Sequence, residues 1–542
     1  MPTSFICAVD VGTASARAGI FDLKGRMLAR EVRAISLWQG AGEKAEHSSE
    51  NIWAAVCEAV RAAMAVARVQ PAEIKALGFD ATCSLVLRDA DGAPLELGDA
   101  GRDTISWFDH RAVAEAAVCD ATGHPVLAHI GGSMSPEMQM PKLMWLKRHR
   151  PDLWAGLGGA FDLADFLTWR ATGSTARSIC TVTAKWGYLA HAGGWQADFL
   201  AAIGLDDLIA RAGLPAQATP VGGTVGTVSA AAAGDLGLVA GTPVAAGMID
   251  AFAGALGVLG GGQTAVGQTA GNKSAGAQSE TLALIAGTST CVMSITRDPW
   301  AREGIWGPYL GAVLPGLWVN EGGQSATGAL LDHVLRLHGL EATGASHALV
   351  CARLEEMLAR GEMGRDVGRG LHVLPDFNGS RSPFADPLAR GVIHGLTLDR
   401  SFDAACAVYW RAAVGLALGM RQIIEHMETD PQDADCAAPR KIRRLIVAGG
   451  HGRSDLLMQL YADVTGCAVE ICHEPDAVLA GTAMAAAATG PINGAKAAAE
   501  AMAARSRRLE PNLMRRGAFE ADYAIFLRLQ AHRAEIATMP QG

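Results

Sequence analysis

Our prediction of the fold starts from the stretch Gly247–Gly254, which has the sequence GMIDAFAG. The apolar run 238–247 before it is bounded by turn residues and is typical of a strand, and residues 251–259 are typical of a helix start. Asp250 is therefore a lone carboxylate at the point where a buried strand gives way to a helix. In open α/β sheets, ligands bind beyond the carboxyl ends of the strands. A carboxylate there can accept a proton from a hydroxyl nucleophile, or it can merely cap the helix.

Length and composition restrict the class of protein. A single hydrophobic core stops growing at about 250–300 residues, so a chain of 542 residues is expected to hold two or more domains. Half of the residues are hydrophobic and 19% are charged, which is the profile of a globular protein. The net charge of −9 at pH 7 is mild and offers no basic surface for nucleic acid.

The sequence gives no signal for membrane insertion or export. The most apolar run, 238–259, contains Pro243 and Asp250, and the first ten residues lack the charged and apolar regions of a signal peptide. The eleven cysteines are scattered without a C-x-x-C pair, which favours reduced thiols. We therefore predict a cytoplasmic protein without a membrane or nucleic-acid partner.

Two similar hairpins lie far apart in the chain. Each has an apolar strand, a small glycine-opened turn with hydroxyl side chains, and a second apolar strand; the turns are Gly12–Ser15 and Gly287–Thr290. Glycine lets a ligand approach the backbone, and the N–H groups of such a turn can hold a phosphate. Because Gly287 aligns with Gly12 and the following threonines align with each other, we predict two homologous domains.

Two helices are also indicated. Ser48 or Ser49, with Glu50 close behind, predicts the start of a helix that continues through Ala67. The alanine-rich run 477–489 predicts another helix near the end of the chain.

A third glycine turn, Gly449-Gly450, follows the apolar strand 444–448 and precedes a helix. Together with the two hairpins it resembles the nucleotide clamp of actin-like ATPases. The chain contains no G-x-x-x-x-G-K-[ST] motif, which argues against a Walker-type NTPase. The turn does not match G-x-G-x-x-G either, which argues against a nicotinamide dehydrogenase.

Over nearly its whole length the sequence resembles the FGGY carbohydrate kinase family, and within it the ribulokinase and pentulose kinase branch. The segments that carry the resemblance occur in the family's order: Val9–Arg17, Trp107–Arg111, Met248–Ala251, Gly287–Cys291, Asn320–Ser325 and Ala448–Gly450. The resemblance implies an α/β protein with two actin-like ATPase (ribonuclease H-like) domains that face each other across a cleft. We place an N-terminal sugar-binding domain at residues 1–262 and a C-terminal nucleotide-binding domain at 263–542, with the glycine-rich run 260–278 as their connection.

The resemblance also implies catalytic roles. Asp250 would be the general base, and Asp10 with Asp250 would approach Mg²⁺, through water in the case of Asp10, because Mg²⁺ keeps most of its hydration shell. The alternative for Asp10 is a strand-end cap. The residues expected to bind ATP are Gly12, Thr13, Ser15, Gly287, Thr288, Ser289, Gly449 and Gly450.

For the sugar, a site with paired donors and acceptors is expected, because such a site rejects analogues that lack a hydroxyl. Lys185 and Glu321 can alternatively be surface charges, and Arg17 either neutralises transferred charge or bridges the sheet. The residues expected to bind the substrate are Trp107, Asp109, Lys185, Asp250 and Glu321.

Departures from the family pattern bear on the substrate. Residues 80–83 stand where glycerol kinases carry an Arg-Glu pair, so glycerol is disfavoured. We predict ATP- and Mg²⁺-dependent phosphorylation of a ketopentose at its terminal hydroxyl, D-ribulose to D-ribulose 5-phosphate, with L-ribulose, ribitol and xylulose as alternatives. An actin-fold ATPase without a sugar substrate and an inactive sugar sensor are alternatives from other classes. Whether the protein is a homodimer stays open.

Overall fold

The computed structural model describes residues 4–40, 44–98, 101–259, 280–360, 367–428, 441–472 and 476–539. The chain forms two compact units. Unit 1 comprises residues 1–277, 295–320 and 476–505, and unit 2 comprises residues 278–294, 321–475 and 506–542. The predicted domain boundary at 262/263 and the predicted connection 260–278 lie outside the described residues.

Unit 1 is organised around β1 (Phe5–Val11), the centre of a seven-stranded sheet. β1 pairs antiparallel with β2 (Ser15–Asp22) and parallel with β6 (Ile74–Ala81). From Ile6 to Val11 every residue of β1 is buried, as expected of a strand that is covered on both faces. The remaining strands of this sheet are β3 (Met27–Ala34), β10 (Thr224–Thr227), β11 (Pro243–Ala245) and β12 (Met248–Ile249).

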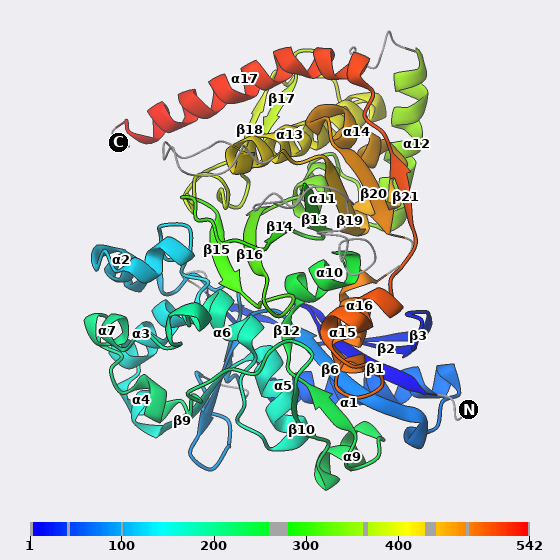
Figure 1. Ribbon diagram of the computed structural model, residues 1–542. Coiled ribbons are helices and arrows are strands. Elements are labelled where there is room, and N and C mark those ends of the chain that lie inside the picture. Colours follow the sequence, from blue (N-terminus) through cyan, green and yellow to red (C-terminus); the bar gives the residue numbers. More distant parts are fainter. Residues whose placement is uncertain are drawn as a thin grey trace. The chain divides into compact units, whose positions relative to one another are not determined.

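Two helices of unit 1 are packed backbone to backbone. Figure 1 shows α10 (Asp250–Leu259) and α15 (Ala477–Ala487) side by side. A Cβ atom on Gly481 would lie 1.8 Å from the carbonyl oxygen of Ala253, and one on Gly257 would lie 2.0 Å from that of Ala477. Only glycine permits this approach. Since α10 begins at Asp250, the packing fixes the helix that carries this carboxylate.

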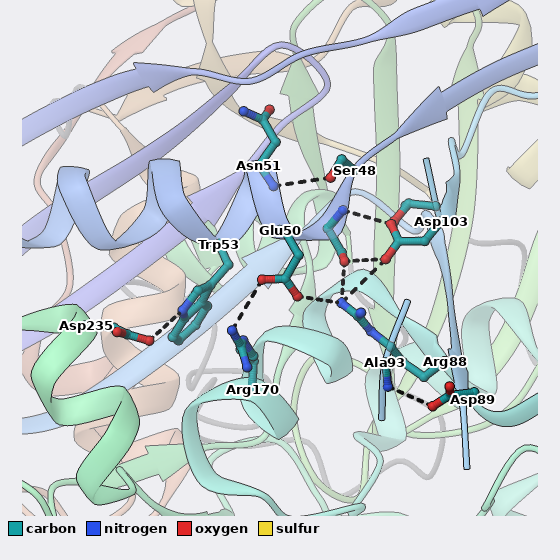
Figure 2. Close-up of polar contacts among 12 residues, drawn as sticks. Ser48, Glu50, Asn51, Trp53, Arg88, Asp89, Ala93, Asp103, Arg170 and Asp235 are labelled. Atoms are coloured by element: carbon teal, nitrogen blue, oxygen red, sulfur yellow. Dashed lines mark hydrogen bonds and ion pairs between the residues drawn. The ribbon is translucent and has the colours of Figure 1, made fainter. Parts of the chain in front are cut away.

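A buried charge network ties α1 (Ser49–Ala67) to the strands beside it (Figure 2). The guanidinium of Arg88 is almost completely buried, and its Nη2 donates to the hydroxyl of Ser49 and to Glu50, 3.2 Å away. Asp103 accepts hydrogen bonds from both the N–H and the hydroxyl of Ser49. The predicted helix start is thereby confirmed, with Ser48 as the residue that caps it by accepting from the N–H of Asn51.

A second sheet of unit 1 has the order β4-β5-β8-β7-β9. Its strands are β4 (Trp38–Gly40), β5 (Lys44–His47), β7 (Leu85–Asp89), β8 (Thr104–Ile105) and β9 (Leu157–Asp162). Unit 1 also holds β15 (Trp306–Leu310) and the helices α2 (Val113–Ala121), α3 (Gln139–His149), α4 (Pro151–Gly156), α5 (Leu163–Thr172), α6 (Ile179–Lys185), α7 (Ala197–Ala202), α8 (Leu208–Arg211), α9 (Ala230–Leu236) and α16 (Ala495–Ala501), with short 3-10 turns at η1 (Pro71–Glu73), η2 (Pro125–His129) and η3 (Ala190–Ala192).

Unit 2 repeats the central arrangement of unit 1. β13 (Thr281–Ala286) pairs antiparallel with β14 (Thr290–Thr296) and parallel with β19 (Arg444–Gly449), as β1 does with β2 and β6. The two predicted hairpins are therefore confirmed. The sheet continues through β16 (Trp318–Gln324) on one side and β20 (Ala468–Cys472) and β21 (Ser506–Leu509) on the other.

The other elements of unit 2 are mainly helices: α11 (Gly328–Leu337), α12 (Gly344–Arg360), α13 (Phe402–Glu428), α14 (Asp455–Thr465) and α17 (Leu513–Ala537), together with η4 (Gly450–Arg453) and the strand pair β17 (His372–Leu374) and β18 (Val392–His394). Within the described parts of the chain, no helix is long and apolar enough to cross a membrane.

Candidate active site

Three neighbouring parallel strands of unit 1 end in carboxylates. Asp10 of β1 lies opposite Asp80 of β6 in the parallel register, and Met248 of β12 lies on the other side of Asp80. Asp250 follows β12 directly and is the first residue of α10, so its predicted place between strand and helix is confirmed. Asp10 and Asp80 are fully buried, whereas Asp250 is half-buried. The carboxyl ends of these strands therefore form an acidic site.

Asp250 makes a local contact as well. Its Oδ1 accepts a hydrogen bond from the N–H of Ala251, the next residue, over 2.7 Å. A helix cap accepts from the second or third N–H of a helix, so this contact does not establish the capping alternative.

Arg17 is the counter-ion of the acidic site. It faces Asp10 across the first hairpin, with its Nη2 2.8 Å from Asp10 Oδ2 and its Nη1 3.6 Å from Asp476 Oδ2. Asp476 precedes α15 and also pairs with Arg30 Nε at 2.9 Å. Arg17 therefore links the sheet to the start of α15, which is the bridging role considered for it.

The pKa values of the two buried carboxyl groups are raised. Burial raises the pKa of Asp10 to about 7, against the lowering effect of Arg17, and the charges of Asp476 and Asp250 add to the increase. Burial and the neighbouring Asp10 raise the pKa of Asp80 well above its ordinary value, although the hydroxyl of Thr482 donates to Asp80 Oδ2. Burial and the neighbouring Asp10 thus both favour the protonated form of Asp80.

The acidic site fits a magnesium ion. Asp10 Oδ1 is buried and accepts no hydrogen bond from a donor among the described residues. Mg²⁺ takes one or two carboxylates and completes its shell with water and phosphate oxygens. Asp10 and Asp250, at the ends of β1 and β12 on either side of β6, supply such a donor set.

Trp107 joins this site to the first glycine turn. Its indole Nε1 donates to Thr13 Oγ1 over 2.9 Å, and its backbone N–H donates to Ser84 Oγ over 3.1 Å. The turn itself closes through the N–H of Gly12, which donates to the carbonyl of Ser15. Thr13 and Trp107, both predicted as binding residues, are therefore in direct contact.

Lys185 stands at the last position of α6 and is buried. Its Nζ lies 4.2 Å from the centre of the Trp306 ring, a cation–π arrangement. At the other end of the same helix, Cys180 Sγ accepts the N–H of Ile249, which directly precedes Asp250. The helix α6 therefore connects Lys185 to the strand that delivers the proposed base.

Asp109 is placed differently from the other expected sugar residues. It is fully buried, and it accepts from Arg111 Nε at 2.8 Å and Nη2 at 2.7 Å and from the N–H of Ala45 at 2.6 Å. Arg111 also pairs with Glu46 at 2.7 Å. These contacts favour a structural role for Asp109 in holding the loop of Trp107.

In unit 2, the second and third glycine turns lie next to each other. Gly449 pairs with Ala286 at the end of β13, and a Cβ atom on Gly449 would lie 2.2 Å from the carbonyl oxygen of Ala286. Gly449 also has a φ of 99°, a conformation that favours glycine. The turn after β13 closes through the N–H of Gly287, which donates to the carbonyl of Ser289 over 2.9 Å. The residues predicted to bind ATP in this unit, Thr288 and Gly450 among them, are thus brought to one edge of one sheet.

Glu321 lies on β16 of unit 2 and is buried, with only 3% of its side chain exposed. Its Oε1 is 3.9 Å from Arg381 Nη1. The same Arg381 nitrogen donates to Cys291 Sγ over 3.3 Å, just beyond the second glycine turn. The surface-charge alternative for Glu321, and likewise for the buried Lys185, is therefore wrong.

Comparison with protein families agrees with this geometry. Residues 5–257 match the N-terminal domain, and residues 282–490 the C-terminal domain, of the FGGY family of carbohydrate kinases. The chain belongs to the FGGY family of carbohydrate kinases. Its resemblance to this family is thereby confirmed, and the protein is a carbohydrate kinase with ATP as phosphate donor.

This FGGY kinase has relatives that match it over most of their length. The FGGY carbohydrate kinase domain-containing protein of Homo sapiens is 39% identical and covers 98% of this chain and 97% of its own length. The D-ribulokinase of Saccharomyces cerevisiae is 34% identical over 89% of this chain and 72% of its own.

Solved structures show the same fold. The xylulose kinase of Rhodospirillum rubrum superposes with a TM-score of 0.77 at 23% identity, covering 98% of this chain and 99% of its own. The ligand-bound xylulose kinase of Lactobacillus acidophilus gives 0.78 at 18% identity, covering 98% of each chain. The predicted fold of two actin-like domains is thus confirmed for this FGGY kinase.

Sequence reasoning missed several residues of this FGGY kinase. Asp80 ends an apolar strand as Asp10 does, and that parallel is the signal that could have found it. Asp476 and Thr482 gave no such signal, because they lie far along the chain from the residues that they contact. Thr482 and Asp80, for example, are 402 positions apart.

Proposed function

We propose that this FGGY kinase transfers the γ-phosphoryl group of ATP to the terminal hydroxyl of a ketopentose, D-ribulose before other pentuloses. The observation that carries the proposal is the set of carboxylates at the ends of β1, β6 and β12, with Trp107 bonded to the glycine turn beside them. The similarity to the D-ribulokinase of Saccharomyces cerevisiae supports the choice of sugar.

Asp250 is the proposed base. It takes the proton of the sugar hydroxyl while that oxygen forms a bond to the γ-phosphorus, and the bond from that phosphorus to the bridging oxygen of ADP breaks. Phosphoryl transfer depends mainly on positioning and on stabilisation of charge. A magnesium ion held by Asp10 and Asp250 would supply positive charge to the phosphates.

The remaining expected residues divide between the units. In unit 1, Trp107 and Lys185 are proposed to contact the sugar, with Gly12, Thr13 and Ser15 on a phosphate. A site built from paired donors and acceptors selects a polyol by its hydroxyls. In unit 2, Glu321 is proposed to contact the sugar, and Gly287, Thr288, Ser289, Gly449 and Gly450 to contact ATP.

The proposal is tested by measuring ADP release with a panel of pentuloses and pentitols. D-ribulose should give the highest kcat/KM, and L-ribulose, xylulose and ribitol should follow. ATP hydrolysis that no sugar accelerates would favour an actin-fold ATPase, and sugar binding without ADP release would favour a sensor.

The base is tested with Asp250→Asn, which keeps the oxygen that accepts from Ala251 and removes the charge. Turnover should fall by about a hundredfold or more, the range of a lost general base, while ATP binding persists. Asp206→Asn, at an exposed carboxylate, is the control. Wild-type kcat in the Asp250→Asn variant would remove this residue from the role of base.

A further inference from the structure

The first turn of α3 presents two fully buried polar side chains on one face, because Gln139 and Lys142 are three positions apart. Gln139 Nε2 donates to the carbonyl of Cys83 over 2.9 Å and to Asp162 Oδ2 over 3.1 Å. Lys142 Nζ donates to the carbonyls of Ser106 and Trp107 over 2.9 and 3.2 Å. One helical turn therefore holds both the loop after β6 and the loop after β8.

Complete burial of Lys142 is costly. Lysine is almost never fully buried in proteins unless its charge is paired, since an ammonium loses its hydration. Here the two hydrogen bonds of the ammonium go to backbone carbonyls of the Trp107 loop. When a buried lysine departs from this tendency beside a functional site, we expect it to serve that site.

These hydrogen bonds fix the position of Trp107. Its backbone is held on both sides, since its N–H donates to Ser84 Oγ and its carbonyl accepts from Lys142. With the backbone fixed, the side-chain torsions alone place the indole, and the bond from Nε1 to Thr13 restricts those as well. The ring is thereby held in one orientation beside the first glycine turn.

We propose that Lys142 is a positioning residue of the sugar site: it fixes the Ser106–Trp107 backbone, and through it the plane of the Trp107 indole against which the sugar binds. This inference rests on the proposed function, because it takes Trp107 to be a sugar contact. Lys142 itself touches neither substrate.

The first test compares Lys142→Met with Lys147→Met. Lys147 lies on the same helix and also donates to a carbonyl, that of Gly204 at 2.7 Å, and to Asp207 at 2.8 Å, but it is half-buried and neither of these partners belongs to the loop of Trp107. Loss of hydrogen bonds from a charged donor should raise the sugar KM of Lys142→Met by about tenfold or more. The KM for ATP and the sugar-independent hydrolysis of ATP should stay at wild-type values, and Lys147→Met should resemble the wild type throughout.

The second test is a double-mutant cycle with Trp107→Ala. If Lys142 acts through Trp107, Lys142→Met should raise the sugar KM no further once the indole is gone. An equal increase in both backgrounds would overturn the proposal and leave Lys142 a structural residue. Should Lys142→Met fail to fold, Lys142→Gln, which keeps a neutral donor, enters the same cycle. Failure of both variants to fold would also overturn the proposal, because the lysine would then serve the fold itself.

The outcomes separate this inference from the proposed function. If the wild type phosphorylated no sugar, the proposed function would be wrong. Sugar phosphorylation by the wild type with an unchanged sugar KM in Trp107→Ala would remove Trp107 from the sugar site, and the role of Lys142 with it, while the kinase activity stands.

Discussion

Trp107 donates its indole N–H to the hydroxyl of Thr13 over 2.9 Å. Trp107 is proposed to contact the sugar, and Thr13 belongs to the glycine turn that is proposed to bind a phosphate. Thr13 follows the end of β1, and Trp107 donates its backbone N–H to Ser84, which follows the end of β6. The hydrogen bond to Thr13 therefore fixes the proposed sugar contact, Trp107, relative to the turn that is proposed to bind phosphate.

Trp107→Phe should therefore lower kcat/KM even though an aromatic ring remains. The variant loses one hydrogen bond, which corresponds to a decrease of about threefold to tenfold. Thr13→Val removes the acceptor and should have a similar effect. Steady-state kinetics of the double variant should show no further decrease, and a fully additive decrease would mean that the two side chains act independently.

Asp80→Asn should retain most of the activity, whereas Asp10→Asn should lose nearly all of it. The pKa of Asp80 is raised well above its ordinary value by burial and by Asp10, which favours the protonated carboxyl, and an amide is a close substitute for that form. The carboxylate of Asp10 is the one paired with Arg17 and expected to approach Mg²⁺. The dependence of kcat on Mg²⁺ concentration measures both effects. A large loss of activity in Asp80→Asn would show that Asp80 acts in its ionised form.

Arg88→Met should destabilise unit 1 strongly. It removes the cation next to Asp103, which is fully buried and 3.4 Å away, and breaking such a buried pair costs about 3–5 kcal/mol. Arg170→Met is the matched control, since Arg170 and its partner Glu50, 3.3 Å away, are both exposed (Figure 2), and a surface pair contributes about 1 kcal/mol or less. Urea-induced unfolding of the two variants should give clearly different midpoints. Equal midpoints would show that Arg88 contributes no more than a surface charge.

The features that the sequence predicted correctly are those that depend on residues close together in the chain. Asp250 was placed correctly because an apolar run followed by a helix start is visible in neighbouring residues, and the same holds for the helix that begins at Ser49. The two glycine hairpins were found because each is contained in about fifteen residues of sequence and the second repeats the first.

Contacts between distant segments could not be predicted in this way. Residues 295–320 and 476–505 belong to unit 1, although most of the chain around each of these segments belongs to unit 2. The local composition of the sequence does not mark the points where the chain returns to unit 1. Thr482 reaches Asp80, and Trp306 covers Lys185, only because tertiary packing brings these segments back. The prediction of Asp109 as a sugar contact could not take account of Arg111, to which the fold binds its carboxylate.

Lys142 should also leave a signature in the pH dependence of stability. Burial lowers the pKa of its ammonium to about 8, although Cys83, Asp109, Glu137 and Asp162 around it act in the opposite direction. Between this value and the ordinary 10.5, the unfolded chain binds more protons than the folded one, so the free energy of unfolding gains a contribution that rises with pH. Below pH 8 the folded protein carries the full cost of the buried charge.

The wild type should therefore gain roughly 3–4 kcal/mol of unfolding free energy relative to Lys142→Met as the pH increases through this window, since one pKa unit corresponds to about 1.4 kcal/mol. Urea-induced unfolding of both proteins and of Lys147→Met from neutral to alkaline pH measures the difference. Burial raises the pKa of the Cys83 thiol to about 12, and that contribution is common to all three proteins and cancels. Parallel curves for the wild type and Lys142→Met would show that Lys142 titrates as an exposed lysine does.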